Sequence, residues 1–498
     1  MTKLSFLFLF MTLHLYSQQS DYRLNGLEIE VENLMKAYKT IGVSVAIVEN
    51  NKLVYSKGFG YRDFENKLPV DPNTLFSIGS ITKQFTASLI GIYEAKGELS
   101  VFDKPKKHID YLQFYSDEMN NLITIEDLLT HNSGIGVVDG THVFFPTNNI
   151  KKHLQRLPYL LPNSKIREKF DYSNMGYAIL GAIGESITHK SWSNNITQDI
   201  FMPLQMSQSC TNLNSLQKNA NFSYGYGVGK RKNIIKVLYE DQYESAASGG
   251  VNSTASDMAK WMLMLLNKGN YKNSSILPKE FIERSFSEHN IIRTSFSFDK
   301  KYNLLNDAYG YGWFTHNYKG LFRVNHEGNV SGFTSSINLY PYKKLGIVVL
   351  TNQGSANLLN KAITDIITNR MLNLKRKDWN KYKVNYGEAT DFNTPMSGIN
   401  KNKKPSHSLS EFSGKYTNKG YGTLKVTIIN DTLMVTFPAF KMSLAHQYFN
   451  VFVNKRISEI HQNIPQFYFN FLDDNDGKIS KLTINMQAKP IVFTKNNN

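Results

Sequence analysis

The chain has 498 residues, of which 41% are hydrophobic, 13% aromatic and 20% charged. This length suffices for two or three domains, and the composition excludes a fibrous or disordered protein. The formal net charge of +16 predicts attraction to polyanions. Basic residues are nevertheless scattered, and no helix-turn-helix, zinc-finger or RNA-binding pattern occurs, so no nucleic-acid partner is expected. Cys210 is the only cysteine, which excludes an intrachain disulfide.

Residues 1–17 are typical of a secretory signal peptide. Lys3 precedes an apolar run from Leu4 to about Tyr16, and polar residues follow. The alternative is a membrane anchor, but an anchor needs roughly 20 apolar residues and His14 interrupts this run. We therefore expect export to the periplasm or the extracellular space, with no membrane span after cleavage of the signal.

The next segments predict a sheet built from distant parts of the chain. Residues 43–62 favour two strands joined at an Asn pair, and residues 345–352 favour another strand. Between them, residues 82–96 carry apolar side chains at helical spacing, and Gly97 is expected to end that helix. A sheet made from both ends of one domain, with helices between, is the predicted architecture.

The composition changes after about residue 374. Residues 375–408 are basic, polar and interrupted by Gly and Pro, which indicates a linker. Residues 409–498 are rich in β patterns, including a hairpin over residues 424–437 with a turn at an Asn-Asp pair. The acidic stretch DDNDGK resembles a calcium loop, but it lacks the later Glu of an EF-hand and is interpreted as a turn.

Ser80 and Lys83 are candidates for a nucleophile and its base. A serine hydroxyl needs a neighbouring base and a site that stabilises the oxyanion formed on its target carbonyl. A helix start supplies unpaired N–H groups, and a lysine three residues later lies on the same face. The same spacing occurs at Ser215 and at Ser297, so the context must decide.

Two further elements offer partners for Ser80. Tyr172 and Asn174 precede an apolar helix expected to begin near Gly176, and could share in proton transfer and grip a substrate amide. In the stretch VNHEGNVSGF, Gly328 permits close approach of a substrate backbone to an edge strand. The amide of Asn329 could then complete an oxyanion hole with that of Ser80.

Six stretches in this order resemble the serine hydrolases of the class C β-lactamase, D,D-carboxypeptidase and esterase family. They are LFSIGSITKQFTA, TIEDLLTHNSGI, YSNMGYAILG, SGGVNSTASDMAKWM, YGYGWF and HEGNVSGFTS, and the resemblance covers roughly residues 25–370. For residues 22–374 the resemblance implies an α/β (α+β) fold, a β-lactamase/transpeptidase-like antiparallel sheet with flanking helices and a helical region. Residues 409–498 resemble the small β-barrel domain often appended to such hydrolases.

The resemblance also implies the roles of the site residues. Ser80 is the acylated nucleophile, Lys83 and Tyr172 share proton transfer, and Asn174 binds substrate. The amides of Ser80 and Asn329 form the oxyanion hole. His131, in the family loop THNSGI, is given a structural role. No cofactor or metal is expected, since neither His-Glu-x-x-His nor paired-Cys spacing occurs.

One departure from the family pattern bears on the substrate. Class C β-lactamases carry Lys-Thr-Gly where this chain has His326, Glu327 and Gly328. His326 is expected to be an electrostatic or hydrogen-bonding group near a bound carboxylate or ester. We therefore expect an exported hydrolase of small-molecule or peptide substrates, cell-wall peptides among them, cleaving a peptide, amide or ester bond. The alternatives are a β-lactamase and a slowly deacylating penicillin-binding-like receptor.

Overall fold

The structure is a computed structural model. It describes residues 21–136, 140–229, 233–239, 244–293, 307–375, 379, 403–455, 466–486 and 489–496. The signal peptide predicted at residues 1–17, and most of the linker predicted at residues 375–408, lie outside the described residues.

Nine strands of the described chain form one antiparallel sheet in the order β10-β11-β12-β13-β14-β15-β1-β2-β3. Their bounds are β1 (Gly42–Glu49), β2 (Lys52–Asp63), β3 (Leu68–Pro69), β10 (Asn290–Arg293), β11 (Asp307–Tyr309), β12 (Phe314–Tyr318), β13 (Leu321–Val330), β14 (Phe333–Tyr340) and β15 (Leu345–Thr351). β1 pairs with β15 from Val43 opposite Thr351 to Glu49 opposite Leu345. The prediction of a sheet made from both ends of the domain is confirmed.

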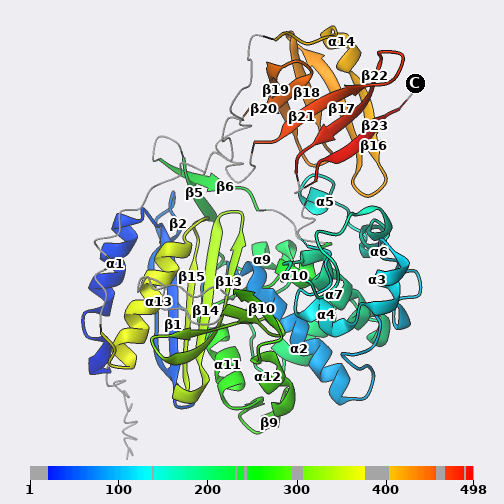
Figure 1. The fold of residues 1–498 in the computed structure, drawn as a ribbon. Helices are drawn as coiled ribbons and strands as arrows, with labels where there is room; N and C mark the ends of the chain where they lie inside the picture. Colours follow the sequence, from blue (N-terminus) through cyan, green and yellow to red (C-terminus); the bar gives the residue numbers. More distant parts are fainter. Residues whose placement is uncertain are drawn as a thin grey trace, which may run out of the picture.

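Helices cover both faces of this sheet (Figure 1). α1 (Leu27–Ala37) and α13 (Asn357–Met371) lie together on one face, while α2 (Thr82–Ala95) and α11 (Ala255–Leu266) lie on the opposite side. The other helices are α3 (Asp117–Leu122), α4 (Ile125–Leu129), α5 (Gly140–Val143), α6 (Ile150–Leu154), α7 (Asn174–Thr188), α8 (Trp192–Ile196), α9 (Leu213–Lys218), α10 (Ala246–Gly249), α12 (Lys279–Ser285) and α14 (Leu409–Phe412). The fold class predicted from the sequence is confirmed, with a helical region beside the sheet.

Two helix boundaries can be compared with the positions predicted from the sequence. α2 ends at Ala95, one residue before the predicted end, and Gly97 follows with a left-handed φ of +75°. α7 begins at Asn174 and not near Gly176. The Ser173 hydroxyl accepts a hydrogen bond from the Gly176 amide at 3.1 Å, so this serine caps the helix two residues earlier than predicted.

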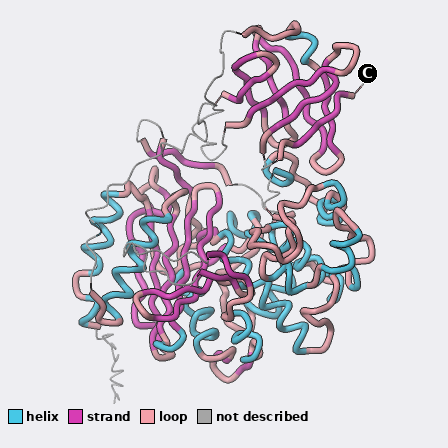
Figure 2. The backbone as a smooth tube through the Cα atoms, in the orientation of Figure 1, coloured by secondary structure: helices cyan, strands magenta, loops and turns pink. Residues whose placement is uncertain are grey.

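The C-terminal region is a closed barrel of eight strands, shown above the helical region in Figures 1 and 2. The strands are β16 (Gly414–Asn418), β17 (Gly422–Ile429), β18 (Thr432–Thr436), β19 (Lys441–Tyr448), β20 (Val451–Asn454), β21 (Tyr468–Asp473), β22 (Ile479–Ile484) and β23 (Ile491–Lys495). The predicted hairpin is β17–β18, whose turn residues Asn430 and Asp431 both have positive φ. The stretch DDNDGK forms the predicted turn between β21 and β22.

Three two-stranded ladders complete the described strands. They are β4 (Phe76–Ser77) with β7 (Asn252–Ser253), β5 (Gly225–Val228) with β6 (Ile234–Val237), and β8 (Asn270–Tyr271) with β9 (Ser274–Ser275). The strand β4 of the first ladder ends three residues before Ser80 and sets the path of the backbone that leads to this serine. Among the described residues, no helix is long and apolar enough to cross a bilayer.

Candidate active site

Ser80 lies in a short 3-10 helix, Gly79–Ile81, that leads into α2. The chain is held on both sides of Ser80 by Val251, the residue directly before β7. The Ile78 amide donates to the Val251 carbonyl at 3.1 Å, and the Val251 amide donates to the Thr82 hydroxyl at 3.0 Å. These two bonds fix the position of the serine hydroxyl before any substrate is present.

Lys83 lies one turn along from Ser80, with its side chain fully buried. Its Nζ donates to Ser80 Oγ at 3.1 Å, to Asn174 Oδ1 at 2.7 Å and to the Ser248 carbonyl at 2.9 Å. The same nitrogen lies 4.7 Å from the centre of the Tyr172 ring. Lys83, Tyr172 and Asn174, predicted to act with Ser80, therefore lie in one cluster around it.

His131 holds the segment that carries Tyr172 and Asn174. Its φ is +57°, and its carbonyl accepts the Asp171 amide at 3.0 Å. Its Nδ1 accepts the Ser173 amide at 3.0 Å, so a proton of the neutral ring resides on Nε2. Burial, together with the charge of Lys83, holds the pKa of His131 well below its ordinary value. The ring centre lies 4.3 Å from that of Tyr172, so this histidine packs directly against the tyrosine.

The strand that carries Gly328 and Asn329 lies against the segment before Ser80. β12 pairs with β13 only as far as Asn325, which leaves the following residues at a free edge on that side. A Cβ at Gly328 would lie 1.8 Å from the Ile78 carbonyl oxygen, and a Cβ at Gly79 would lie 2.8 Å from the Asn329 nitrogen. Two glycines thus allow the close backbone approach that brings the amides of Ser80 and Asn329 into one region.

His326 lies in the same strand but is 2% exposed. Its Nδ1 lies 2.6 Å from the Glu327 carbonyl, which can only accept, so Nδ1 carries the proton. Its Nε2 then accepts the Tyr309 hydroxyl at 3.1 Å. Burial, and secondly the charge of Lys83, lower the pKa of His326 to about 3. Both ring nitrogens are therefore engaged within the protein, and the geometry favours a positioning role over the substrate contact predicted from the sequence.

The Glu327 carboxylate points away from this cluster. Asn357, the first residue of α13, donates to its Oε2 at 2.6 Å. Alternation along β13 puts neighbouring residues on opposite faces, so Glu327 faces α13 while His326 and Gly328 face the helical region. Its negative charge therefore lies on the other side of the sheet from Ser80.

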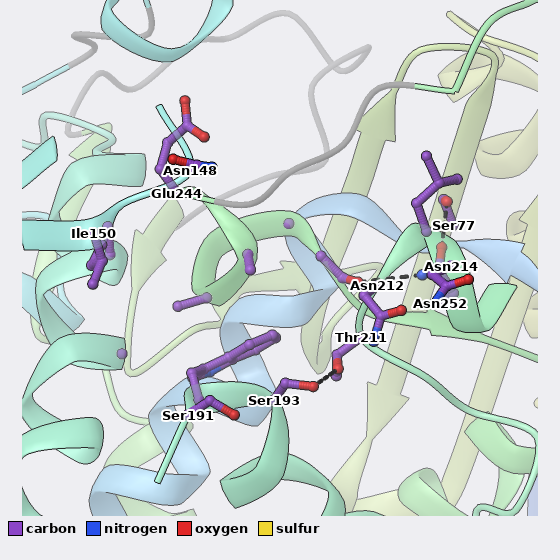
Figure 3. A pocket seen from close by; sticks show the side chains of 18 of the residues that line it. Ser77, Asn148, Ile150, Ser191, Ser193, Thr211, Asn212, Asn214, Glu244 and Asn252 are labelled. Carbon is purple, nitrogen blue, oxygen red and sulfur yellow. Dashed lines mark hydrogen bonds between the residues drawn. The ribbon is translucent and has the colours of Figure 1, made fainter. Parts of the chain in front are cut away.

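A cavity of about 760 Å³, shown in Figure 3, is lined by residues close in the chain to the cluster but not by Ser80, Lys83, Tyr172 or Asn174 themselves. Its lining includes Ser77, close before Ser80, and Val330, directly after Asn329. Ser77 donates a hydrogen bond to Asn252 at this end, and Asn148 and Glu244 lie at the far side. Sequence analysis missed this cavity because its walls come from many loops and no motif marks them.

The sheet, the Ser80 to Lys83 helix and the facing strand together define a serine hydrolase. The chain belongs to the beta-lactamase family, whose model matches residues 28–367. Residues 400–495 match a second family, described as a domain of unknown function, DUF3471.

Several known proteins are similar to this chain. Protein flp of Staphylococcus aureus (strain MRSA252) is 28% identical over 361 residues, which cover 71% of this chain and 68% of that protein. The unguisins hydrolase ungD' of Aspergillus campestris is 26% identical over 370 residues, covering 71% and 66%. An octameric penicillin-binding protein homologue from Pyrococcus abyssi has a similar fold, with a TM-score of 0.62 and 24% identity, covering 94% of this chain and 99% of that one.

Proposed function

We propose that this protein is an exported serine hydrolase that cleaves a peptide, amide or ester bond through an acyl-enzyme on Ser80. The observation that carries the proposal is the 3.1 Å contact between Ser80 Oγ and the buried Nζ of Lys83. Membership of a family of serine hydrolases and the name of the unguisins hydrolase support hydrolysis as the reaction. The pattern of residues 1–17 supports export.

Proton transfer is assigned to the groups around Lys83. Ser80 Oγ attacks the carbonyl carbon of the substrate, and its proton passes to the neutral amine of Lys83 or to the phenolate of Tyr172 as the new C–O bond forms. The same proton then reaches the leaving group, so that the peptide nitrogen or ester oxygen departs neutral. Asn174 contacts Lys83 through its carbonyl oxygen, and its amide N–H₂ group is assigned to the substrate. The amides of Ser80 and Asn329 stabilise the oxyanion.

The charge of the site favours neutral groups beside the scissile bond. His326 is uncharged at neutral pH, and it replaces the lysine that β-lactamases of this family carry. A substrate carboxylate therefore meets no fixed cation at this position. This supports a peptidase or esterase, with small molecules or cell-wall peptides as substrates, over a β-lactamase. A slowly deacylating receptor would share the acylation step and differ only in the hydrolysis that follows.

The test is the mass of the intact mature protein after incubation with a fluorophosphonate and, separately, with a penicillin. We expect a stable phosphonate adduct that peptide mapping places on Ser80, and penicillin either ignored or retained as a long-lived acyl-enzyme. Penicillin that is consumed without a lasting adduct would instead identify a β-lactamase. The mass of the untreated protein also reports whether residues 1–17 have been removed.

Ser80→Ala is the matched control for this experiment. The substitution removes the nucleophile while leaving the backbone amide of the proposed oxyanion hole in place. We expect it to abolish both the phosphonate adduct and ester hydrolysis. Labelling that persists at the wild-type rate, or that maps to Ser215 or Ser297, would show that the assignment of the nucleophile is wrong.

A further inference from the structure

Two phenylalanines of the hydrolase domain are inserted into the mouth of the C-terminal barrel. Phe144 and Phe145 follow α5 and are 4% and 2% exposed. The ring centre of Phe144 lies 5.0 Å from that of Phe437 and 5.1 Å from that of Phe440. The ring centre of Phe145 lies 5.5 Å from that of Phe437 and 5.9 Å from that of Phe493. The two regions therefore share one aromatic contact, which we call the Phe144–Phe145 seam.

The chain that leaves this seam becomes a wall of the cavity that Ser77 and Val330 also line. Arg156 Nη2 donates to the Phe145 carbonyl at 2.8 Å, and the Thr147 amide donates to Glu244 Oε1 at 3.2 Å. Residues 148–151 then line the cavity. The chain that enters the wall is thus held by the barrel contact and by the hydrogen bonds to Arg156 and Glu244, so the position of the wall depends on all three.

Beside its apolar residues, the cavity lining holds uncharged hydrogen-bonding groups. They include the amides Asn148, Asn212 and Asn214 and the hydroxyls Ser191, Ser193 and Thr211. Asn148, Asn212, Asn214 and Ser191 are exposed, so their amide and hydroxyl groups are accessible to amide or hydroxyl groups of a ligand.

The charged groups of the lining oppose an anionic ligand. Glu185 and Glu244 both line the cavity, and Glu185 Oε1 accepts the Trp192 amide at 2.8 Å. The Nζ of Lys151, a cation of the same lining, lies 4.8 Å from the centre of the Tyr111 ring, which is not part of the cavity wall. Two carboxylates against one lysine that is directed elsewhere favour a neutral ligand.

We propose that the barrel is a specificity element of the hydrolase: through the Phe144–Phe145 seam it holds the cavity wall that receives an extended, neutral, hydrogen-bonding part of the substrate. This inference rests on the function proposed above. Phe144 and Phe145 are positioning residues, since they touch the barrel and not the substrate. The seam therefore affects which substrates fit, while the chemistry at Ser80 depends on Lys83 and its neighbours.

The experiment compares the rates at which two fluorophosphonates label Ser80 in the full-length mature protein. One probe carries only a methyl arm, and the other carries an oligo(ethylene glycol) arm, which is neutral and accepts hydrogen bonds. We expect the wild type to react faster with the glycol probe. We define the ratio of rates as the rate of Ser80 labelling by the glycol probe divided by that by the methyl probe. Phe145→Ala should lower this ratio by about tenfold, because a displaced cavity wall no longer orients the glycol arm. The rate of labelling by the methyl probe itself should change little.

Phe471→Ala is the matched control, since it removes one buried phenyl ring from the barrel interior. The Phe471 ring contacts those of Phe412 and Phe452, away from the seam. We expect this variant to keep the wild-type ratio of rates. If Phe145→Ala does not fold, Phe145→Leu keeps the seam apolar and should lower the ratio in the same direction by a smaller factor.

Two results would overturn the inference while leaving the proposed function intact. One is equal rates for both probes in the wild type, which would mean that the cavity does not receive the arm. The other is a ratio that stays at the wild-type value in Phe145→Ala, or that falls equally in Phe471→Ala. Failure of the proposed function has a different signature, because neither probe would then label Ser80 in the wild type.

Discussion

The two sides of Ser80 differ in charge although both are buried. On one side, the amine of Lys83 donates to three oxygens, those of Ser80, Asn174 and Ser248. On the other side, His326 is neutral and has both ring nitrogens engaged by its own strand and by Tyr309. A buried amine surrounded by oxygens can move a proton, whereas a buried neutral histidine with no free nitrogen can only hold its neighbours in place.

This difference assigns proton transfer to the side of Lys83 and leaves no charged group on the side of His326 to recognise a charge on the substrate. The Lys-Thr-Gly pattern of the family would put a second cation in place of His326, and in this chain Lys83 is the cation that remains beside Ser80. The following predictions test the contrast by altering each side, beginning with the largest expected effect.

Lys83→Ala should have the largest effect. Without the amine, the Ser80 hydroxyl loses a group that can accept its proton, and we expect the rate of labelling by a fluorophosphonate to fall by about a thousandfold. Circular dichroism and thermal unfolding should establish that the variant is folded. A loss of less than about tenfold would assign proton transfer to Tyr172 alone.

Asn174→Ala should have an intermediate effect. It removes the carbonyl oxygen that lies 2.7 Å from Lys83 Nζ and the amide group assigned to the substrate. We expect kcat/KM for a peptide-like ester to fall by about tenfold to a hundredfold, with a smaller loss for p-nitrophenyl acetate. Equal losses for the two esters would contradict the substrate contact and leave only the contact with Lys83.

His326→Gln should change stability more than activity. The pKa of His326 is about 3 in the folded protein against 6.5 as its ordinary value, so the unfolded chain binds a proton in this interval that the folded protein does not. The free energy of unfolding therefore falls as the pH drops below 6.5, by about 2 kcal/mol at pH 5 from this residue. Gln keeps the hydrogen bonds without titrating, so the variant should lose about 2 kcal/mol less between pH 7 and pH 5 in urea unfolding.

His407→Gln is a control for that measurement, because the expected change in stability with pH has the opposite sign. His407 lies on the barrel between Glu411 and Asp473, at 2.9 Å and 2.8 Å, and its hydrogen bond with Glu411 raises its pKa. Its contribution to stability is present below its unfolded pKa and is lost as the pH rises through the folded pKa. This variant should therefore lose more stability on acidification than the wild type. The same direction of change in both variants would contradict the assignment for His326.

Glu327→Gln should have the smallest effect. Its side chain bonds to Asn357 on the far side of the sheet from Ser80, and an amide can replace that contact. We expect kcat/KM for neutral and for anionic esters to stay within about twofold of the wild type. A clear gain with anionic esters alone would show that the carboxylate acts on the substrate after all.

Much of the fold and of the catalytic cluster could be predicted because each part is marked locally. The Asn50 and Asn51 turn, the helix after Ser80 and the β17–β18 hairpin follow from turn residues and periodicity. The start of α7 was missed by two residues, although the Ser173 cap is itself a sequence signal. The grouping of Ser80 with Lys83 and Asn174 followed from the family resemblance.

The environment of His326 could not be predicted from the sequence. A histidine before a glycine can face a substrate or a neighbouring strand, and only the fold shows that Tyr309 occupies its Nε2. The Phe144–Phe145 seam was missed for a similar reason. A change of composition at residue 374 suggests two separate domains, but it carries no information about which distant side chains meet across them.

The pairing of β1 with β15 has a consequence for the order in which the protein matures. Strand partners at the middle of the sheet are separated by about 300 positions in the chain, as in Val43 opposite Thr351. A nascent chain that ends before residue 345 therefore lacks the strand that joins its two halves. Gly328 must also pack against Ile78. The active site around Ser80 therefore forms only after all strands of the sheet have been synthesised. Labelling of Ser80 by a phosphonate should thus report a late step of folding. The reactivity of Ser80 should appear after the helices have formed and not together with them.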